Sequence, residues 1–167
     1  AVDRIGLGVN EIEVCLELLS HIEFDVILLA GRYTLLEQGG LADLLPLCLK
    51  RGVSLYMGGP FNSGILASET DTGPFDYAAP SPDIVARVVQ LRRACEAHNT
   101  PLRAAALAFA GSHQATEAVV AGMSSADEVE HALRDWSCAV PPLLWADLAR
   151  QGLIDPAAVT ALAESAQ

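Results

Sequence analysis

Short apolar segments alternate with segments of helical apolar spacing along most of the chain, and this order constrains the fold more than any other feature. Strands are expected at residues 2–8, 24–30, 53–57 and 118–121. Helices are expected at residues 12–21, 41–50, 83–98, 101–112 and 126–136, with a proline-flanked helical tail at 143–151 and 156–165. Strands that alternate with helices imply right-handed crossover connections, so the pattern predicts a parallel sheet.

Four strand–helix units are compatible with two architectures. They form either half of an eight-unit barrel or a small open sheet of the doubly wound type, and their order alone does not decide. The apolar run FDVILLA at residues 24–30 indicates a strand buried on both faces, as parallel strands usually are. Four strands taken from a barrel would also leave two unpaired edges.

The composition excludes several functional classes. The 167 residues suit one domain with a real core, and the net charge of −11 leaves no basic surface for nucleic acid. No segment reaches the roughly 18 uninterrupted apolar residues of a membrane span, and the chain start has no signal-peptide pattern. The four cysteines are far apart and form no CxxC pair, so reduced thiols, mostly in the core of a cytoplasmic protein, are expected.

A glycine-rich loop, GGPFNSGILA at residues 58–67, follows the third expected strand. Ligands of parallel α/β folds bind at the carboxy ends of the strands. Glycine lets the backbone approach a ligand closely, and exposed N–H groups can meet a phosphate. The alternative is that a strand end simply needs turn residues. The long polar segment that follows, residues 68–82, has the composition of a functional or mobile loop.

A second candidate segment, GMSSADE at residues 122–128, joins the fourth expected strand to its helix. A helix N-terminus offers unpaired N–H groups and the positive end of the helix dipole, which favour a phosphate or an adenosine ribose. Ser125 and Glu128 also form the S-x-x-E pattern of a capping box, in which each side chain satisfies the other's backbone N–H. Binding and capping are both open interpretations of these residues.

Groups suited to catalysis are sparse. Lys50 is the only lysine, and it ends an expected helix just before a strand, which places it at the amino-terminal face, away from barrel chemistry. The histidines have no metal-ligand spacing, so no metal site is predicted. They are His21, His98, His113 and His131.

Several segments in the same order resemble the second half of an aldo/keto reductase. They are RIGLGVNEIEV, FDVILLAGRYTLLEQ, GVSLYMGGPFNSGILA, LRAAALAFA, VVAGMSSADEVEHAL and PPLLWADLARQGLID. The last segment and the NSGILA form of the loop are similar to the sugar-dehydrogenase subgroup. The resemblance implies half of a (β/α)8 TIM barrel at residues 1–140, beginning at the fifth strand, with a helical tail at residues 141–167. The family's catalytic Asp, Tyr, Lys and His belong to earlier strands, so no catalytic residue is carried over.

The resemblance also implies a binding site for a nicotinamide dinucleotide. Residues expected at the cofactor's pyrophosphate are Gly59, Pro60, Phe61, Asn62, Ser63 and Gly64, and those expected at the adenosine phosphate are Gly122, Met123, Ser124, Ser125 and Glu128. Glu128 would repel a 2′-phosphate and accept a hydrogen bond from a ribose hydroxyl, so NAD is expected rather than NADP. Gly58 replaces the family's nicotinamide-stacking aromatic residue, and Tyr56 on the same strand face is the expected substitute.

The implied function of the complete enzyme is NAD-dependent oxidation of a sugar hemiacetal to a lactone. These 167 residues alone are expected to be inactive, because the catalytic tetrad supplies the proton relay. The amino-terminal half or a second copy is expected to cover the open sheet edges. The alternative function is a non-catalytic half-barrel module that self-associates or binds a nucleotide.

Overall fold

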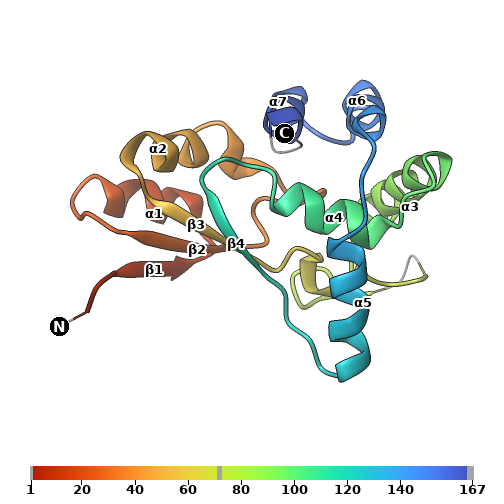
Figure 1. Cartoon of the computed structure of the whole chain (residues 1–167), viewed down its shortest axis with the longest axis horizontal. Coiled ribbons are helices and arrows are strands. Elements are labelled where there is room, and N and C mark those ends of the chain that lie inside the picture. Colours follow the sequence, from red (N-terminus) through yellow and green to blue (C-terminus); the bar gives the residue numbers. More distant parts are fainter. Residues whose placement is uncertain (1, 71–72, 165–167) are drawn as a thin grey trace.

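The computed structural model describes residues 2–70 and 73–164, and it contains every element expected from the sequence (Figure 1). The strands are β1 (Gly6–Val9), β2 (Val26–Ala30), β3 (Ser54–Gly58) and β4 (Thr116–Val120). The helices are α1 (Ile12–Leu19), α2 (Leu44–Arg51), α3 (Pro82–Ala97), α4 (Leu102–Ala110), α5 (Ala126–Trp136), α6 (Pro142–Arg150) and α7 (Pro156–Glu164), with single 3-10 turns η1 (Gly39–Leu41) and η2 (Asn62–Gly64). β1 is shorter than expected. Ser165, expected to end the tail, lies outside the described residues.

The strands pair in parallel in the order β1-β2-β3-β4. This order follows the chain from one edge to the other, as in a barrel, whereas a doubly wound sheet reverses at a switch point. The parallel sheet is therefore confirmed, and the half-barrel is selected over the open alternative. Hydrogen bonding continues past the strand ends, since the N–H of Gly31 donates to Gly58 at 2.9 Å and the N–H of Gly59 donates to Val120 at 3.1 Å.

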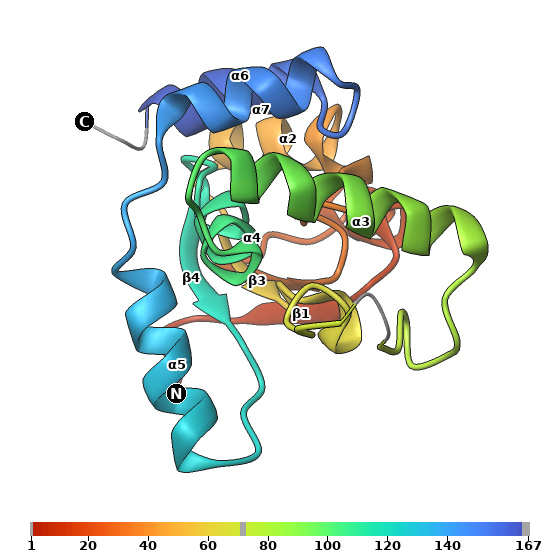
Figure 2. The ribbon, with the colours of Figure 1, turned by 90° about the vertical axis from the view of Figure 1, so that its right-hand side faces the viewer.

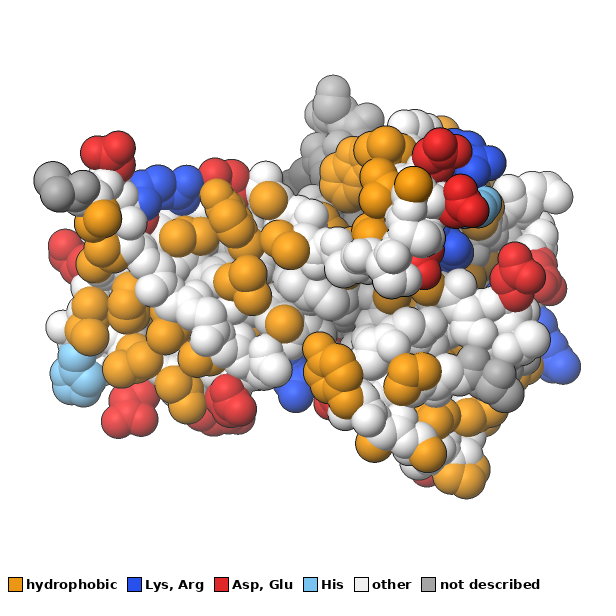
Figure 3. All heavy atoms as spheres, turned by 90° about the horizontal axis from the view of Figure 1, so that it is seen from below, with side chains coloured by type: hydrophobic (Ala, Val, Ile, Leu, Met, Phe, Trp, Pro, Cys, Tyr) orange, Lys and Arg blue, Asp and Glu red, His pale blue; other side chains and the backbone are white. Residues whose placement is uncertain are grey.

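The two faces of the sheet differ in burial. The helices α1, α2 and α4, which contact the strands, cover one face, and there Ile27, Leu29, Leu55 and Met57 are buried. On the other face Leu28 is 36% exposed, and Figure 3 shows hydrophobic side chains at the surface over the sheet. The prediction that β2 is buried on both faces is wrong, because a single layer of helices covers the sheet.

Helix ends follow sequence signals. The Ser81 hydroxyl accepts a first-turn backbone N–H of α3 at 3.3 Å, and Pro82 takes the first helical position. α2 ends at Gly52, which has a left-handed φ of 69°. At α5 the Ser125 hydroxyl accepts the N–H of Glu128 at 3.2 Å. The caps at Ser81 and Ser125 fix where α3 and α5 begin after the loops that build the site.

The helical tail packs on the half-barrel. α6 and α7 contact each other, and α6 contacts α3 (Figure 2). The ring of Phe109 on α4 lies 4.9 Å from that of Tyr33 and 6.3 Å from that of Trp145 on α6, between ring centroids. The Tyr33 hydroxyl lies 3.0 Å from the Ser112 hydroxyl, so this buried polar group has a partner. One core thus joins the sheet helices to the tail.

No helix in the described part of the chain is long and apolar enough to cross a membrane. Cys15, Cys48 and Cys95 are buried and Cys138 is partly buried, all as free thiols, so the predicted core position is confirmed for three of them. Burial raises the pKa of the Cys95 thiol to about 12. This thiol is therefore protonated at neutral pH.

Candidate functional site

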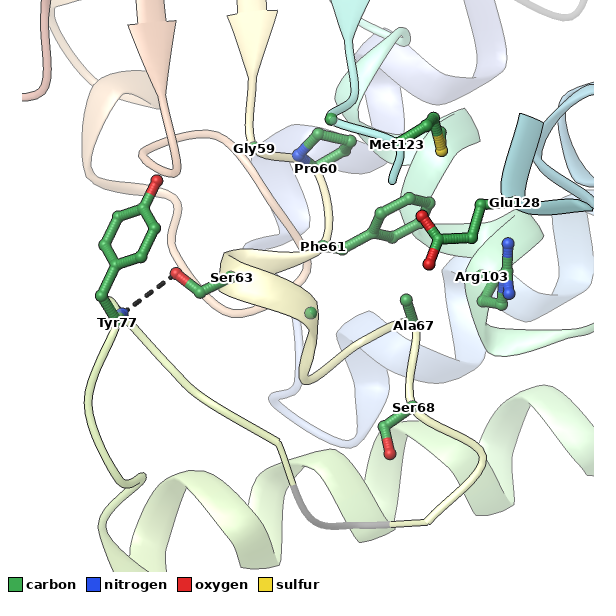
Figure 4. Close-up of a pocket in the computed structure, with 12 residues that line it drawn as sticks. Gly59, Pro60, Phe61, Ser63, Ala67, Ser68, Tyr77, Arg103, Met123 and Glu128 are labelled. Carbon is green, nitrogen blue, oxygen red and sulfur yellow. Dashed lines mark hydrogen bonds between the residues drawn. The ribbon is translucent and has the colours of Figure 1, made fainter. Parts of the chain in front are cut away.

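A pocket of about 460 Å³ opens at the carboxy ends of β3 and β4 (Figure 4). This volume lies in the range of about 300–1,000 Å³ that small-molecule sites occupy. The lining comes from the loop after β3, the first turn of α4, the segment between β4 and α5, and the first turn of α5. The lining residues are Gly59, Pro60, Phe61, Ser63, Gly64, Ala67, Ser68, Tyr77, Arg103, Gly122, Met123 and Glu128. Both segments predicted as candidate sites therefore meet at one edge of the sheet.

The first wall of the pocket, residues 59–68, is shaped by its backbone. Asn62, Ser63 and Gly64 have positive φ angles of 45°, 62° and 111°. This left-handed region costs a residue with a side chain about 1 kcal/mol or more, so the surrounding structure must hold it. Leu66 in the same wall is fully buried in the core. Core packing therefore fixes this wall.

Asn62 lies beneath the pocket rather than at its surface. The residue is buried, and its Nδ2 donates to the carbonyl of Gly31 at 3.5 Å. Its Oδ1 is buried and accepts no hydrogen bond from the described residues. Asn62 thus ties the first wall to the loop after β2, and a contact with a ligand stays a prediction.

The second wall, residues 122–128, is held by polar contacts. The Glu128 carboxylate accepts the N–H of Ser124 at 2.7 Å and its hydroxyl at 2.9 Å. These two hydrogen bonds lower the pKa of Glu128 from its usual value. The capping interaction is confirmed, but the carboxylate bonds the N–H of Ser124 in place of that of Ser125. A negative charge therefore faces the pocket at neutral pH.

Arg103 places a positive charge between the two walls. Its guanidinium carbon lies 5.8 Å from the centre of the Phe61 ring, within cation–π range. Its Nε lies 2.8 Å from Oδ2 of Asp135 on α5, yet this buried Nε makes no hydrogen bond of acceptable geometry. We regard the contact as an ion pair, because charge attraction tolerates a bent angle that a hydrogen bond does not. The terminal amino groups of Arg103 have no hydrogen bond to a described residue.

Tyr77 stands at the other end of the pocket from Arg103 (Figure 4). It is 94% exposed and forms a tight turn with Asp76, in which both residues have positive φ. The Ser63 hydroxyl accepts the N–H of Tyr77 at 3.1 Å, and Arg32 pairs with Asp76 at 3.4 Å. The pocket thus has a charged end and an aromatic end.

Two glycines leave backbone open to a bound group. A Cβ placed on Gly64 or Gly122 would meet no atom within 4 Å, and both residues line the pocket. A side chain at either position would therefore take up space in the pocket itself. This cradle fits a ligand that lies against the backbone, as the pyrophosphate of a dinucleotide does.

Most predicted site residues line this pocket, but Asn62, Ser124 and Ser125 do not. The expectation that Tyr56 substitutes at the nicotinamide stays a prediction. Its hydroxyl donates to Glu117 at 3.2 Å, and Tyr56 does not line the pocket. Its side chain leans toward Glu117, near the start of β4, and so away from the carboxy ends of the strands.

Three lining residues, Ser68, Tyr77 and Arg103, lie outside both segments predicted as candidate sites, and Ala67 lies within the first segment but was not predicted as a ligand contact. One signal was available for Arg103, since a lone charge stands in the first turn of an otherwise apolar helix, LRAAALAFA. Tyr77 lies in the long polar loop without any periodic signal. Only the loop's path brings it to the pocket.

The groups considered for catalysis or metal binding lie elsewhere. Lys50 is in the last turn of α2, and neither it nor any histidine lines the pocket. Within residues 2–70 and 73–164, no group of three His, Cys, Asp or Glu side chains is placed to hold a metal. The residues that line the pocket are therefore suited to binding a ligand, and neither Lys50 nor a histidine is among them.

The fold and the pocket define a protein of parallel βα units whose candidate ligand site lies at the carboxy ends of the strands. Residues 1–148 match the family model described as "Aldo/keto reductase family". The chain belongs to this family.

Two curated relatives each align with 92% of the chain. Pyridoxal 4-dehydrogenase of Microbacterium luteolum is 38% identical over 154 residues, and D-threo-aldose 1-dehydrogenase of Pseudomonas sp is 31% identical over 155 residues. The matches cover only 45% and 47% of those proteins. The chain thus spans about half the length of the curated relatives it matches.

Solved structures that match this fold are also covered over only about half of their length. The holo form of aldo-keto reductase AKR11C1 from Bacillus halodurans superimposes with a TM-score of 0.64 at 21% identity, covering 97% of this chain and 49% of that one. The apo form gives a TM-score of 0.61. The described fold is half of an aldo/keto reductase barrel.

Proposed function

We propose that the chain is the carboxy-terminal, cofactor-binding part of an NAD-dependent aldo/keto reductase. The observation that carries this proposal is the pocket at the carboxy ends of the strands, where Gly64 and Gly122 leave the backbone open between the two walls. Ligands of barrel enzymes bind at this end of the strands.

The residues of each wall would hold a different part of the dinucleotide. Within residues 59–64, the N–H groups of Gly59, Asn62 and Gly64 already donate to carbonyls of the described chain, and Pro60 has no N–H. The remaining backbone N–H groups, those of Phe61 and Ser63, suit the pyrophosphate, and the ionised Glu128 suits a ribose hydroxyl donor. Bound nicotinamide supplies the hydride acceptor of the reaction. The side chains of this pocket bind and orient, while proton transfer belongs to the family's tetrad in earlier strands.

The preference for NAD rests on Glu128. Replacing Glu128 with Arg is expected to weaken NAD binding and improve NADP binding by about 1–3 kcal/mol, the range of a charge-assisted hydrogen bond gained or lost. Isothermal titration calorimetry of the complete barrel, in which both cofactor loops are held in place, measures the change with both dinucleotides. A loss of thermal stability without a change in the NAD-to-NADP affinity ratio would leave Glu128 as a helix cap only.

The substrate we propose for the complete enzyme is a sugar hemiacetal, oxidised to a lactone as its carbon gives a hydride and its hydroxyl a proton. One relative is named for D-threo-aldose, and the other for pyridoxal, which is the second candidate substrate. The isolated chain is expected to show no NAD-dependent oxidation of L-fucose, D-arabinose or pyridoxal. Turnover by a homogeneous sample would contradict the assignment of catalysis to the earlier strands.

A partner half-barrel is proposed to cover the open surfaces. Val129, Leu133 and Trp136 on α5 are exposed, as is Leu28 on the open sheet face. Burial of such apolar area stabilises an assembly. We expect the amino-terminal half of the enzyme to cover these surfaces and, in its absence, a second copy of the chain. Size-exclusion chromatography with light scattering is expected to show association, and a stable monomer at micromolar concentration would contradict this.

The decisive measurement is binding of NAD to the purified chain by calorimetry. Saturable binding that Gly122→Ala weakens is expected, because the added methyl group enters the pocket. Absence of any dinucleotide binding would overturn the proposal. The alternative, a non-catalytic nucleotide-binding module, predicts the same binding but no turnover after the chain is joined to an amino-terminal half of the family.

A further inference from the structure

Three charged side chains meet at the α5 end of the pocket. Glu128 and Arg103 line it, and Asp135 on α5 lies behind Arg103 at 2.8 Å from its Nε. Figure 4 shows the Glu128 carboxylate and the Arg103 guanidinium side by side, close to Phe61. One positive and two negative charges leave one negative charge uncompensated.

Arg103 is held in place from two sides. The Phe61 ring packs against its guanidinium at 5.8 Å, and Asp135 attracts it from α5. The side chains of Arg103 and Asp135 are only 27% and 16% exposed, so water screens the pair less than it screens a surface ion pair. The positive charge of Arg103 is therefore largely matched by Asp135.

This pairing matters for Glu128. Arg103 is close enough to contribute to the lowered pKa of Glu128, after the two hydrogen bonds from Ser124. Without Asp135, the guanidinium charge would be left to offset the charge of Glu128, and this end of the pocket would carry no net negative charge. The terminal amino groups of Arg103, which make no hydrogen bond to a described residue, could then donate two parallel hydrogen bonds to a phosphate without repulsion from an uncompensated carboxylate.

We propose that Asp135 is a positioning residue that makes this end of the pocket reject a phosphate monoester and accept a free ribose hydroxyl. The inference rests on the proposed function, in which an adenine dinucleotide occupies the pocket. Asp135 acts by holding Arg103 in an ion pair, so that the pocket keeps a net negative charge. A 2′-phosphate, with a charge of about −1.5 to −2, meets repulsion there.

Calorimetric titration of the purified chain with NAD and NADP tests the proposal. Asp135→Asn has nearly the same shape as the native side chain and removes only the charge. It is expected to raise the affinity for NADP relative to NAD on the order of tenfold, as one charge-assisted contact provides. Glu128→Gln is expected to give a similar change, and the double variant a larger one than either alone.

Three further variants separate this effect from a loss of structure. Asp135→Glu keeps the charge and is expected to restore the native preference. Arg103→Gln combined with Asp135→Asn is expected to abolish the gain, because the effect passes through the guanidinium. Asp127→Asn is the matched control, since Asp127 is an exposed carboxylate of the first turn of α5 that does not line the pocket.

The outcomes are distinct. If NAD binds the native chain and Asp135→Asn leaves the NADP-to-NAD affinity ratio unchanged, or moves it no more than Asp127→Asn does, the role of Asp135 is refuted while the proposed function stands. A native chain that already binds NADP more tightly than NAD also refutes it. If neither dinucleotide binds the native chain or any variant, the proposed function and this inference fall together.

Discussion

The two walls of the pocket are held by different forces. The first wall, residues 59–68, has left-handed backbone at three successive positions and anchors Leu66 in the core. The second wall, residues 122–128, leads into α5, which has no fully buried residue and is tied down by the Ser124–Glu128 hydrogen bonds and the Arg103–Asp135 ion pair. Packing therefore sets the shape of the pocket on one side, while polar contacts set its charge on the other.

The strongest test of this contrast removes one apolar side chain from each side. Leu66→Ala is expected to lower the free energy of unfolding by about 3 kcal/mol, because it leaves a cavity in a filled core. Val129→Ala on α5 is expected to cost less than about 1 kcal/mol, because that side chain is already 44% exposed. Urea unfolding followed by circular dichroism measures both. Equal losses would mean that both walls depend on packing.

A smaller effect is expected from adding a methyl group to a glycine of each wall. Gly59→Ala is expected to cost about 1–2 kcal/mol, because its φ of 61° strains any residue with a Cβ. Gly122→Ala is expected to change the free energy of unfolding by less than about 0.5 kcal/mol, since its Cβ meets no atom within 4 Å. Thermal melts of the two variants compare the sites. A costly Gly122→Ala would show that the second wall is backbone-constrained too.

Loss of the α5 cap has a more local consequence. Ser125→Ala is expected to destabilise the start of α5 by about 1 kcal/mol, because the N–H of Glu128 loses its acceptor. Hydrogen exchange of the α5 amides is expected to speed up, with little change in the amides of β3. Ser125→Thr keeps a hydroxyl and serves as the control. Equal acceleration of hydrogen exchange in the β3 amides would mean that the second wall opens together with the core of the sheet.

The smallest effect is the pH dependence of the second wall. Hydrogen bonds from Ser124 lower the pKa of Glu128, so the ionised carboxylate stabilises the wall above its ordinary pKa of about 4.5. This contribution is lost as the pH falls through the lowered value. NMR titration of the Ser124 amide is expected to show a midpoint below 4.5, and Glu128→Gln is expected to remove it. A midpoint at or above 4.5 would contradict the observed contact.

The sequence determined the elements and the direction of the sheet, because those depend on local spacing. Apolar runs and helical periods lie within single segments, and turn residues such as Gly52 and Ser81 act on their immediate neighbours. The position of both candidate loops at one edge also followed from the sequence, since the carboxy ends of parallel strands meet there. The capping partner of Ser125 could be read from its S-x-x-E spacing.

Only the tertiary structure decided which side chains face the pocket. Within the first wall, the Asn62 side chain is buried and does not line the pocket, and the Tyr56 hydroxyl donates to Glu117. The pairing of Arg103 with Asp135 joins two helices that are separated in the chain by β4. No local pattern encodes such contacts, because they depend on how α5 packs against α4. The sequence therefore placed the pocket, and the packing of its helices set the charge inside it.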